Sequence, residues 1–135
     1  MSFFRFVFPL NSRDFPGKRW LNVVMRTLHI CSATGYGGGV LLGLPYEQIR
    51  IYFIITAFSG LVMVLVDAFS NGIWLIQNRG WLILLKIVLL GNLWLIAPYE
   101  KWGLMGIIAL SSIVSHGTAN FRYYSPIFRK RIDKL

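Results

Sequence analysis

The chain has 135 residues, of which 56% are apolar and 14% are charged, and its formal net charge is +9. Its apolar runs are long enough to cross the ~30 Å hydrocarbon core of a bilayer, which indicates an integral membrane protein. The positive charge does not indicate nucleic acid, because the bases flank apolar runs and no soluble domain offers a reading surface. Anionic lipid headgroups are the expected counter-charge.

Residues 1–20 are expected to form an interfacial segment that is rich in basic and aromatic residues. Its opening stretch is too short to span a bilayer. Four aromatic rings suit the headgroup zone or a contact with another subunit. These rings belong to Phe3, Phe4, Phe6 and Phe8.

Four apolar runs follow, at residues 21–44, 51–70, 81–97 and 103–123. A helix is the form in which a single apolar segment satisfies its own backbone hydrogen bonds inside a bilayer. The expected fold is therefore all-α, with a four-helix transmembrane bundle over residues 21–123 and a basic cytoplasmic tail over residues 124–135.

Lys and Arg residues concentrate before the first run and in the C-terminal tail, and the loop between the second and third runs carries Arg79, whereas the other two loops each carry one base and one acid. Positive residues are retained on the cytoplasmic side of a membrane. The sequence therefore predicts a multi-pass protein of the cell's inner (cytoplasmic) membrane, with both termini inside.

The first run carries two stripes at helical spacing. One stripe is polar and includes Arg26, His29 and Tyr36; because these residues recur every three or four positions, they are expected to share an inward face. The other stripe consists of small residues, and their spacing is typical of close helix packing, although it would also admit a flat ligand. It consists of Gly35, Gly39 and Gly43.

Each of the other runs carries its own polar residues. Asp67 in the second run is expected either to face the bundle or to reach the headgroups, and Lys86 in the third either pairs with Asp67 or snorkels to the interface. In the fourth run, Ser112 and His116 belong to a small and polar stripe that is expected to face inward.

These polar groups are expected to meet in the cytoplasmic half of the bundle. Two facing imidazoles can hold both axial positions of a haem iron, so His29 and His116 predict a b-type haem in the inner leaflet. Arg26 would pair with a propionate, and Lys86 is an alternative second ligand. The role would be electron transfer or haem-dependent oxidation; any enzymatic activity would be that of an oxidoreductase.

Other interpretations stay open. Either histidine could simply bond a neighbouring hydroxyl, and the chain could be a non-catalytic accessory subunit of a larger membrane complex. A third class is transport, either of ions through the acid and the lysine or of copper through soft and borderline ligands. The copper candidates are His29, Cys31, Met63 and Met105.

Residues 26–43 read Arg-Thr-Leu-His-Ile-Cys-Ser-Ala-Thr-Gly-Tyr-Gly-Gly-Gly-Val-Leu-Leu-Gly. This stretch resembles the first helix of the CopD-like and HemJ-like membrane families, in which a Leu-His-x-x-x-Ala helix ends in a glycine pair. Lys86 is similar to a lysine that accompanies the histidine in the HemJ-like group. The resemblance implies a small helical bundle that handles copper or oxidises protoporphyrinogen with haem, and it implies His29 as a haem ligand and Lys86 as a functional polar group.

Overall fold

A computed structural model describes residues 7–9 and 11–132 of the chain. It divides into two compact units, and each is treated by itself below. One unit, here the first unit, is Arg13–Ser70, and the other, the second unit, combines Met1–Ser12 with Asn71–Leu135. Most described residues are helical, which confirms the all-α prediction. Of the expected terminal segments, residues 1–6, 10 and 133–135 lie outside the described part.

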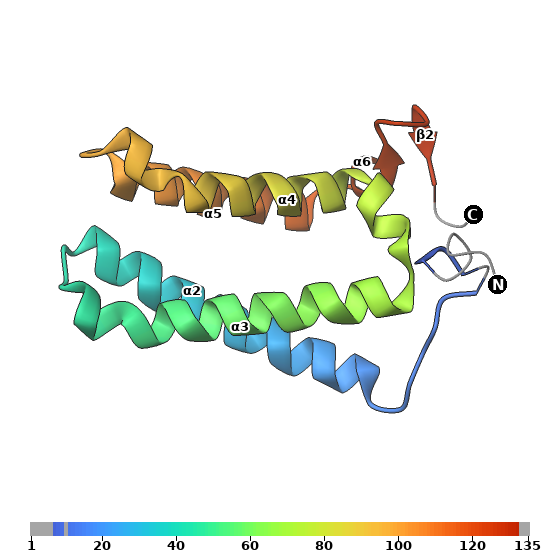
Figure 1. The fold of residues 1–135 in the computed structure, drawn as a ribbon, viewed down its shortest axis with the longest axis horizontal. Coiled ribbons are helices and arrows are strands. Elements are labelled where there is room, and N and C mark those ends of the chain that lie inside the picture. Colours follow the sequence, from blue (N-terminus) through green and yellow to red (C-terminus); the bar gives the residue numbers. More distant parts are fainter. Residues whose placement is uncertain (1–6, 10, 133–135) are drawn as a thin grey trace. The chain divides into compact units, whose positions relative to one another are not determined.

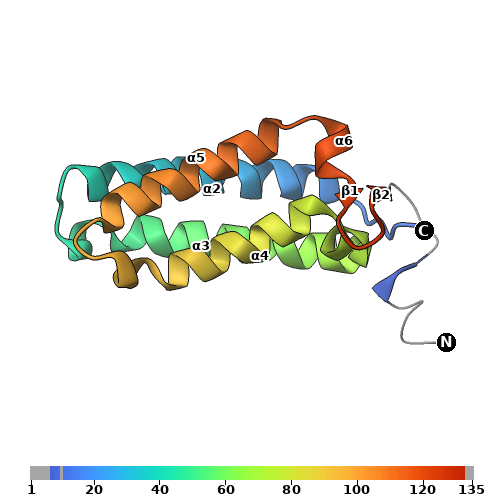
Figure 2. The same cartoon turned by 90° about the horizontal axis from the view of Figure 1, so that it is seen from above.

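The first unit is a helical hairpin. Helix α2 (Lys18–Leu41) and helix α3 (Tyr46–Ser70) run side by side and are joined by a short turn (Figures 1 and 2). Gly43 lies in this turn with φ 69°, a left-handed conformation that glycine adopts without steric cost. The backbone N–H of Leu44 donates to Gly39 O at 2.9 Å. Gly43 was expected in the packing stripe, but it reverses the chain after α2 instead.

The other two glycines of the stripe allow α2 and α3 to approach closely. A Cβ atom added to Gly35 would lie 2.9 Å from the Tyr52 ring, and one added to Gly39 would overlap the Ile49 side chain. Gly39 and Ile49 are both buried. Bulky α3 side chains thus fill the space that the glycines leave, as in close-packed membrane helices.

Arg13 ties the start of the first unit to its end. Its backbone N–H donates to Ser70 O at 2.9 Å, and its guanidinium donates to Phe69 O at 3.1 Å. The guanidinium also lies 5.7 Å from the centre of the Phe69 ring. A cation at this end is favourable because the last carbonyls of a helix lack intrahelical partners and carry partial negative charge. Arg13 therefore closes the hairpin at the end opposite its turn.

The second unit contains two longer helices and several short elements. Helices α4 (Asn78–Gly91) and α5 (Glu100–His116) lie side by side (Figures 1 and 2). A short helix α6 (Ala119–Arg122) follows, and then strands β1 (Tyr124–Ser125) and β2 (Lys130–Arg131) pair antiparallel. The 3-10 helices η1 (Gly72–Ile76) and η2 (Leu93–Ile96) precede and follow α4.

A buried glutamine joins the start of α4 to the tail of the chain. The Gln77 side chain is 2% exposed; its Nε2 donates to Ile132 O at 2.6 Å, and its Oε1 accepts from Arg79 Nε at 2.6 Å. Next to it, Asn78 Nδ2 donates to Phe121 O at 2.9 Å. These bonds hold the chain after α5 against the beginning of α4.

The helix bounds differ from the predicted spans. The third span was expected as one helix to residue 97, but α4 ends at Gly91 and a 3-10 turn follows. The fourth was expected to reach residue 123, but the extended backbone of Gly117 (ψ 155°) ends α5, and the Thr118 side chain caps a new short helix. Judged by length and composition, one described helix, α3, could cross a membrane.

The glycine packing predicts opposite effects for two neighbouring substitutions. We expect Gly39→Ala to reduce the free energy of unfolding by about 1–3 kcal/mol, because the added methyl group overlaps Ile49. Gly38→Ala is the matched control, because an added Cβ there meets nothing within 4 Å; its better helix propensity should be neutral or stabilise by up to about 1 kcal/mol. Thermal unfolding of the purified protein, followed by circular dichroism, measures both. Equal effects of the two substitutions would contradict this packing.

Candidate functional site

The His29 side chain lies between α2 and α3. Its Nδ1 is 2.9 Å from Thr56 O and 3.2 Å from Ser59 Oγ. Because a carbonyl oxygen can only accept, the short contact requires the proton on Nδ1. In the neutral ring, Nε2 then carries the lone pair.

Hydroxyl groups from both helices form further hydrogen bonds near this imidazole. Thr56 Oγ1 lies 2.8 Å from Ser32 Oγ, and the Ser32 hydroxyl also donates to Leu28 O at 2.6 Å. Ser32 and Ser59 are buried. We call the set His29, Ser32, Thr56 and Ser59 the polar seam. It connects α2 to α3 through hydrogen bonds between polar groups of the two helices.

Ser32 and Ser59 were not among the residues expected to line a site, whereas Gly60 was expected on the same face of the second run as Thr56 and Asp67. A Cβ atom added to Gly60 would lie 3.0 Å from His29 Cε1, so the ring rests directly against the α3 backbone. The spacing held a signal for these residues: Ser32 follows His29 by three positions, and Ser59 follows Thr56 by three. Both pairs therefore share a helix face.

Tyr36 packs near the turn end of the same interface. Its ring centre is 5.4 Å from that of Phe53 at an interplanar angle of 50°. Gly35 and Gly39 in this region are covered by α3 side chains. The face that was expected to admit either a helix or a flat ligand is therefore occupied by a helix of the same chain.

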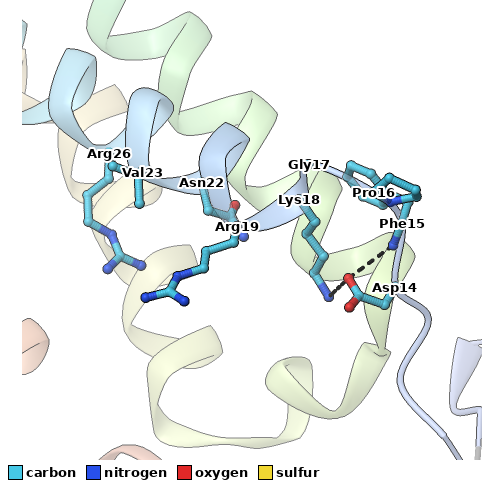
Figure 3. A pocket seen from close by; sticks show the side chains of 9 residues that line it. All are labelled: Asp14, Phe15, Pro16, Gly17, Lys18, Arg19, Asn22, Val23 and Arg26. Atoms are coloured by element: carbon cyan, nitrogen blue, oxygen red, sulfur yellow. Dashed lines mark hydrogen bonds and ion pairs between the residues drawn. The ribbon is translucent and has the colours of Figure 1, made fainter.

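Arg26 lies in a different setting from His29. It lines an open basic pocket of about 720 Å³ at the start of α2. Figure 3 shows Arg19 and Arg26 extending to the same side, whereas Lys18 turns to Asp14, 3.6 Å away. This pocket does not include the polar seam among its lining residues.

Lys86 is half-buried and connects the two long helices of the second unit. Its Nζ donates to Ser111 Oγ at 2.9 Å, which joins α4 to α5. Asp67 is half-buried in α3 of the first unit. The expected Asp67–Lys86 pair would join the two units, so it stays a prediction.

Ser112 and His116 were expected to face inward, yet both are exposed on α5. The neighbouring Ser111 faces α4 instead. His116 belongs to the second unit and His29 to the first, so axial ligation by the two histidines also stays a prediction.

The copper candidates do not form a cluster within one unit, because Met105 lies in the second unit and the others in the first. Cys31 is exposed. Among residues 7–9 and 11–132, no group of three or more His, Cys, Asp or Glu residues could hold a metal ion. This finding concerns metal ions that are bound by side chains alone. It does not test a haem, which needs only one or two protein ligands.

No protein-family model, curated protein or solved structure matches the chain. The resemblance to the CopD-like and HemJ-like families therefore stays a prediction that rests on the first helix and Lys86.

Proposed function

We propose that the chain is a multi-pass membrane protein that serves as a non-catalytic accessory subunit of a larger membrane complex. The pattern of burial along α3 carries the membrane part of this proposal. Large apolar side chains point outward: Phe58 is 60% exposed, Leu61 57% and Leu65 58%, whereas Ser59 is fully buried. In water, exposed apolar surface is unfavourable by about 25 cal/mol per Å². In lipid this cost vanishes, and small or polar residues favour the helix interface.

The second unit shows the same pattern. Ile87 and Val88 of α4 and Ile113 of α5 are exposed, while Gly80 is buried. Although α4 is short, its 14 residues span about 21 Å, and the four residues of η2 extend the apolar run by about 8 Å. The combined length is close to the ~30 Å of a bilayer core. This length supports four spans, with both termini placed in the cytoplasm by the positive-inside rule.

Exposed apolar residues beyond the expected spans support a protein partner. Ile127 and Phe128 are both exposed in the loop between β1 and β2, and basic residues follow them directly. Protein interfaces typically have an apolar centre and a polar rim, and these apolar and basic residues could fill those two places. The partner is thus expected to contact this tail with an apolar, partly acidic surface.

Purification in a mild detergent tests the subunit role. We expect the wild-type chain to elute with membrane partners in constant proportion, because Ile127 and Phe128 bury apolar surface there. The double substitution Ile127→Ser and Phe128→Ser should weaken the complex by more than about tenfold. Leu42→Ser is the matched control, since Leu42 is even more exposed but lies at the opposite side of the expected bilayer. A wild-type chain that elutes alone would contradict the subunit role.

A b-type haem is the second candidate, favoured by the geometry of His29. Histidines that bind metals through Nε2 commonly donate Nδ1–H to a backbone carbonyl, which fixes the tautomer and the ring orientation. His29 makes this contact with Thr56 O. His116 or Lys86 would provide the second axial ligand, and Arg26 would pair with a propionate. A bound haem would supply one-electron chemistry for electron transfer or haem-dependent oxidation.

An absorbance spectrum of the purified protein tests the haem. We expect a Soret band, with α and β bands after reduction, and we expect His29→Ala to abolish them because the axial nitrogen is lost. Ser112→Ala is the control, because the exposed Ser112 hydroxyl makes no hydrogen bond with the described residues. A colourless wild-type protein would contradict the haem and leave the subunit role standing.

A further inference from the structure

Three guanidinium groups of the second unit surround a single tyrosine ring. The Cζ atoms of Arg79, Arg122 and Arg131 lie 5.4, 5.6 and 5.7 Å from the centre of the Tyr123 ring. They come from the start of α4, the end of α6 and strand β2. The fold thus gathers three positive charges from distant parts of the sequence around one ring.

For Arg79 and Arg122, the described part of this unit offers no nearby carboxylate as a counter-charge. Glu100 is the one acid among its described residues, and it begins α5, whereas Arg122 follows the other end of that helix. The 17 residues of α5 span about 25 Å. That distance exceeds the ~8–10 Å over which charges act in physiological salt.

Two of the three arginines also have unused donors. Arg79 donates its Nε to Gln77, but its terminal nitrogens make no hydrogen bond with the described residues. Arg122 Nε is buried and has no partner among them. A buried charged donor without an acceptor is unfavourable, so an oxyanion at this place would stabilise the cluster.

An open pocket adjoins the cluster. It has a volume of about 310 Å³, and Arg79, Tyr123 and Ile73 line it together with neutral polar groups. Arg122 does not line the pocket, but its guanidinium lies against the ring of Tyr123, which does. Ser12 and Asn71 are among these groups, and they are joined to each other by a hydrogen bond of 3.3 Å. A ligand in the pocket would therefore meet a guanidinium and neutral polar side chains.

We propose that Arg79, Arg122 and this pocket bind a phosphate group, and that its source is the headgroup of an anionic phospholipid. The planar guanidinium matches the paired oxygens of a phosphate. The lipid source rests on the proposed membrane function, which places Arg79 and the tail at the cytoplasmic surface, where anionic lipids concentrate. A soluble phosphate would use the same chemistry.

Native mass spectrometry of the full chain in detergent tests this site. The probes are phosphatidylglycerol, phosphatidylcholine and inorganic phosphate. We expect phosphatidylglycerol to bind the wild type most tightly, and we expect Arg122→Gln, which breaks no hydrogen bond with a described residue, to weaken it about tenfold. Arg79→Gln should act alike. Lys130→Gln removes the same charge from the exposed β2 strand and should change binding by less than about twofold.

The outcomes separate the ligand sources. Tighter binding of phosphatidylglycerol than of inorganic phosphate supports the lipid headgroup, and the reverse preference supports the phosphate site while overturning its lipid source. Equal affinities of the wild type and Arg122→Gln, both with unchanged thermal unfolding, would overturn the site. Binding by Asp133→Asn but not by the wild type would also overturn it, because the chain's own carboxylate would then fill the cluster. Neither failure would affect the subunit role, which depends on co-elution with partners.

Discussion

The bond between His29 and the carbonyl of Thr56 sets the spacing of the first hairpin. An imidazole that reaches a backbone carbonyl on the neighbouring helix holds the two backbones close together, and small residues beside the ring allow this spacing. Ser32 and Ser59 therefore occupy the interface beside it, and Gly60 lies under the ring. The large side chains near the ring, Phe58, Leu61 and Leu65, point outward. Toward the turn, Ile49 and Tyr52 enter the interface because Gly39 and Gly35 leave room for them.

This arrangement supports the proposed membrane environment of the hairpin. A hydrogen-bonded interface with little apolar burial gains little stability in water, where solvent competes for the same donors. In a bilayer no water competes, and outward leucine and phenylalanine side chains match the lipid. The proposed membrane location thus follows from which residues are buried, in addition to the hydropathy of the sequence.

The same histidine also explains why two functional interpretations remain. A proton on Nδ1 serves equally well to join two helices and to orient a metal-binding Nε2. The structural role needs only the contacts within the hairpin, whereas the haem also needs a second ligand from the other unit. The lipid-phosphate site depends on neither interpretation, because its arginines belong to α4, α6 and β2.

Local patterns in the sequence predicted the long helices and the packing role of Gly35 and Gly39, because both follow from helical periodicity and residue size. The end of α4 was missed, since the hydropathy of residues 81–97 stays high across Gly91. The end of α5 was missed because the helical spacing of small and polar residues continues past Gly117 to Ala119 and Tyr123. Ser112 was expected to face inward in place of Ser111, because the exact rotation of α5 about its axis depends on how it packs against α4. The cluster at Tyr123 joins residues far apart in the sequence, and no periodicity relates them.

Nitroxide labels along α3 test most directly whether its large apolar side chains face lipid. Single cysteines at Leu61, Leu65 and Val66, introduced into a Cys31→Ser protein in liposomes, report on collisions with dissolved oxygen and with a water-soluble nickel chelate. The outward positions Leu61 and Leu65 should be accessible to oxygen and inaccessible to the chelate, and the buried Val66 should be protected from both. Accessibility of Leu61 and Leu65 to the chelate would show that α3 faces water and would contradict the account.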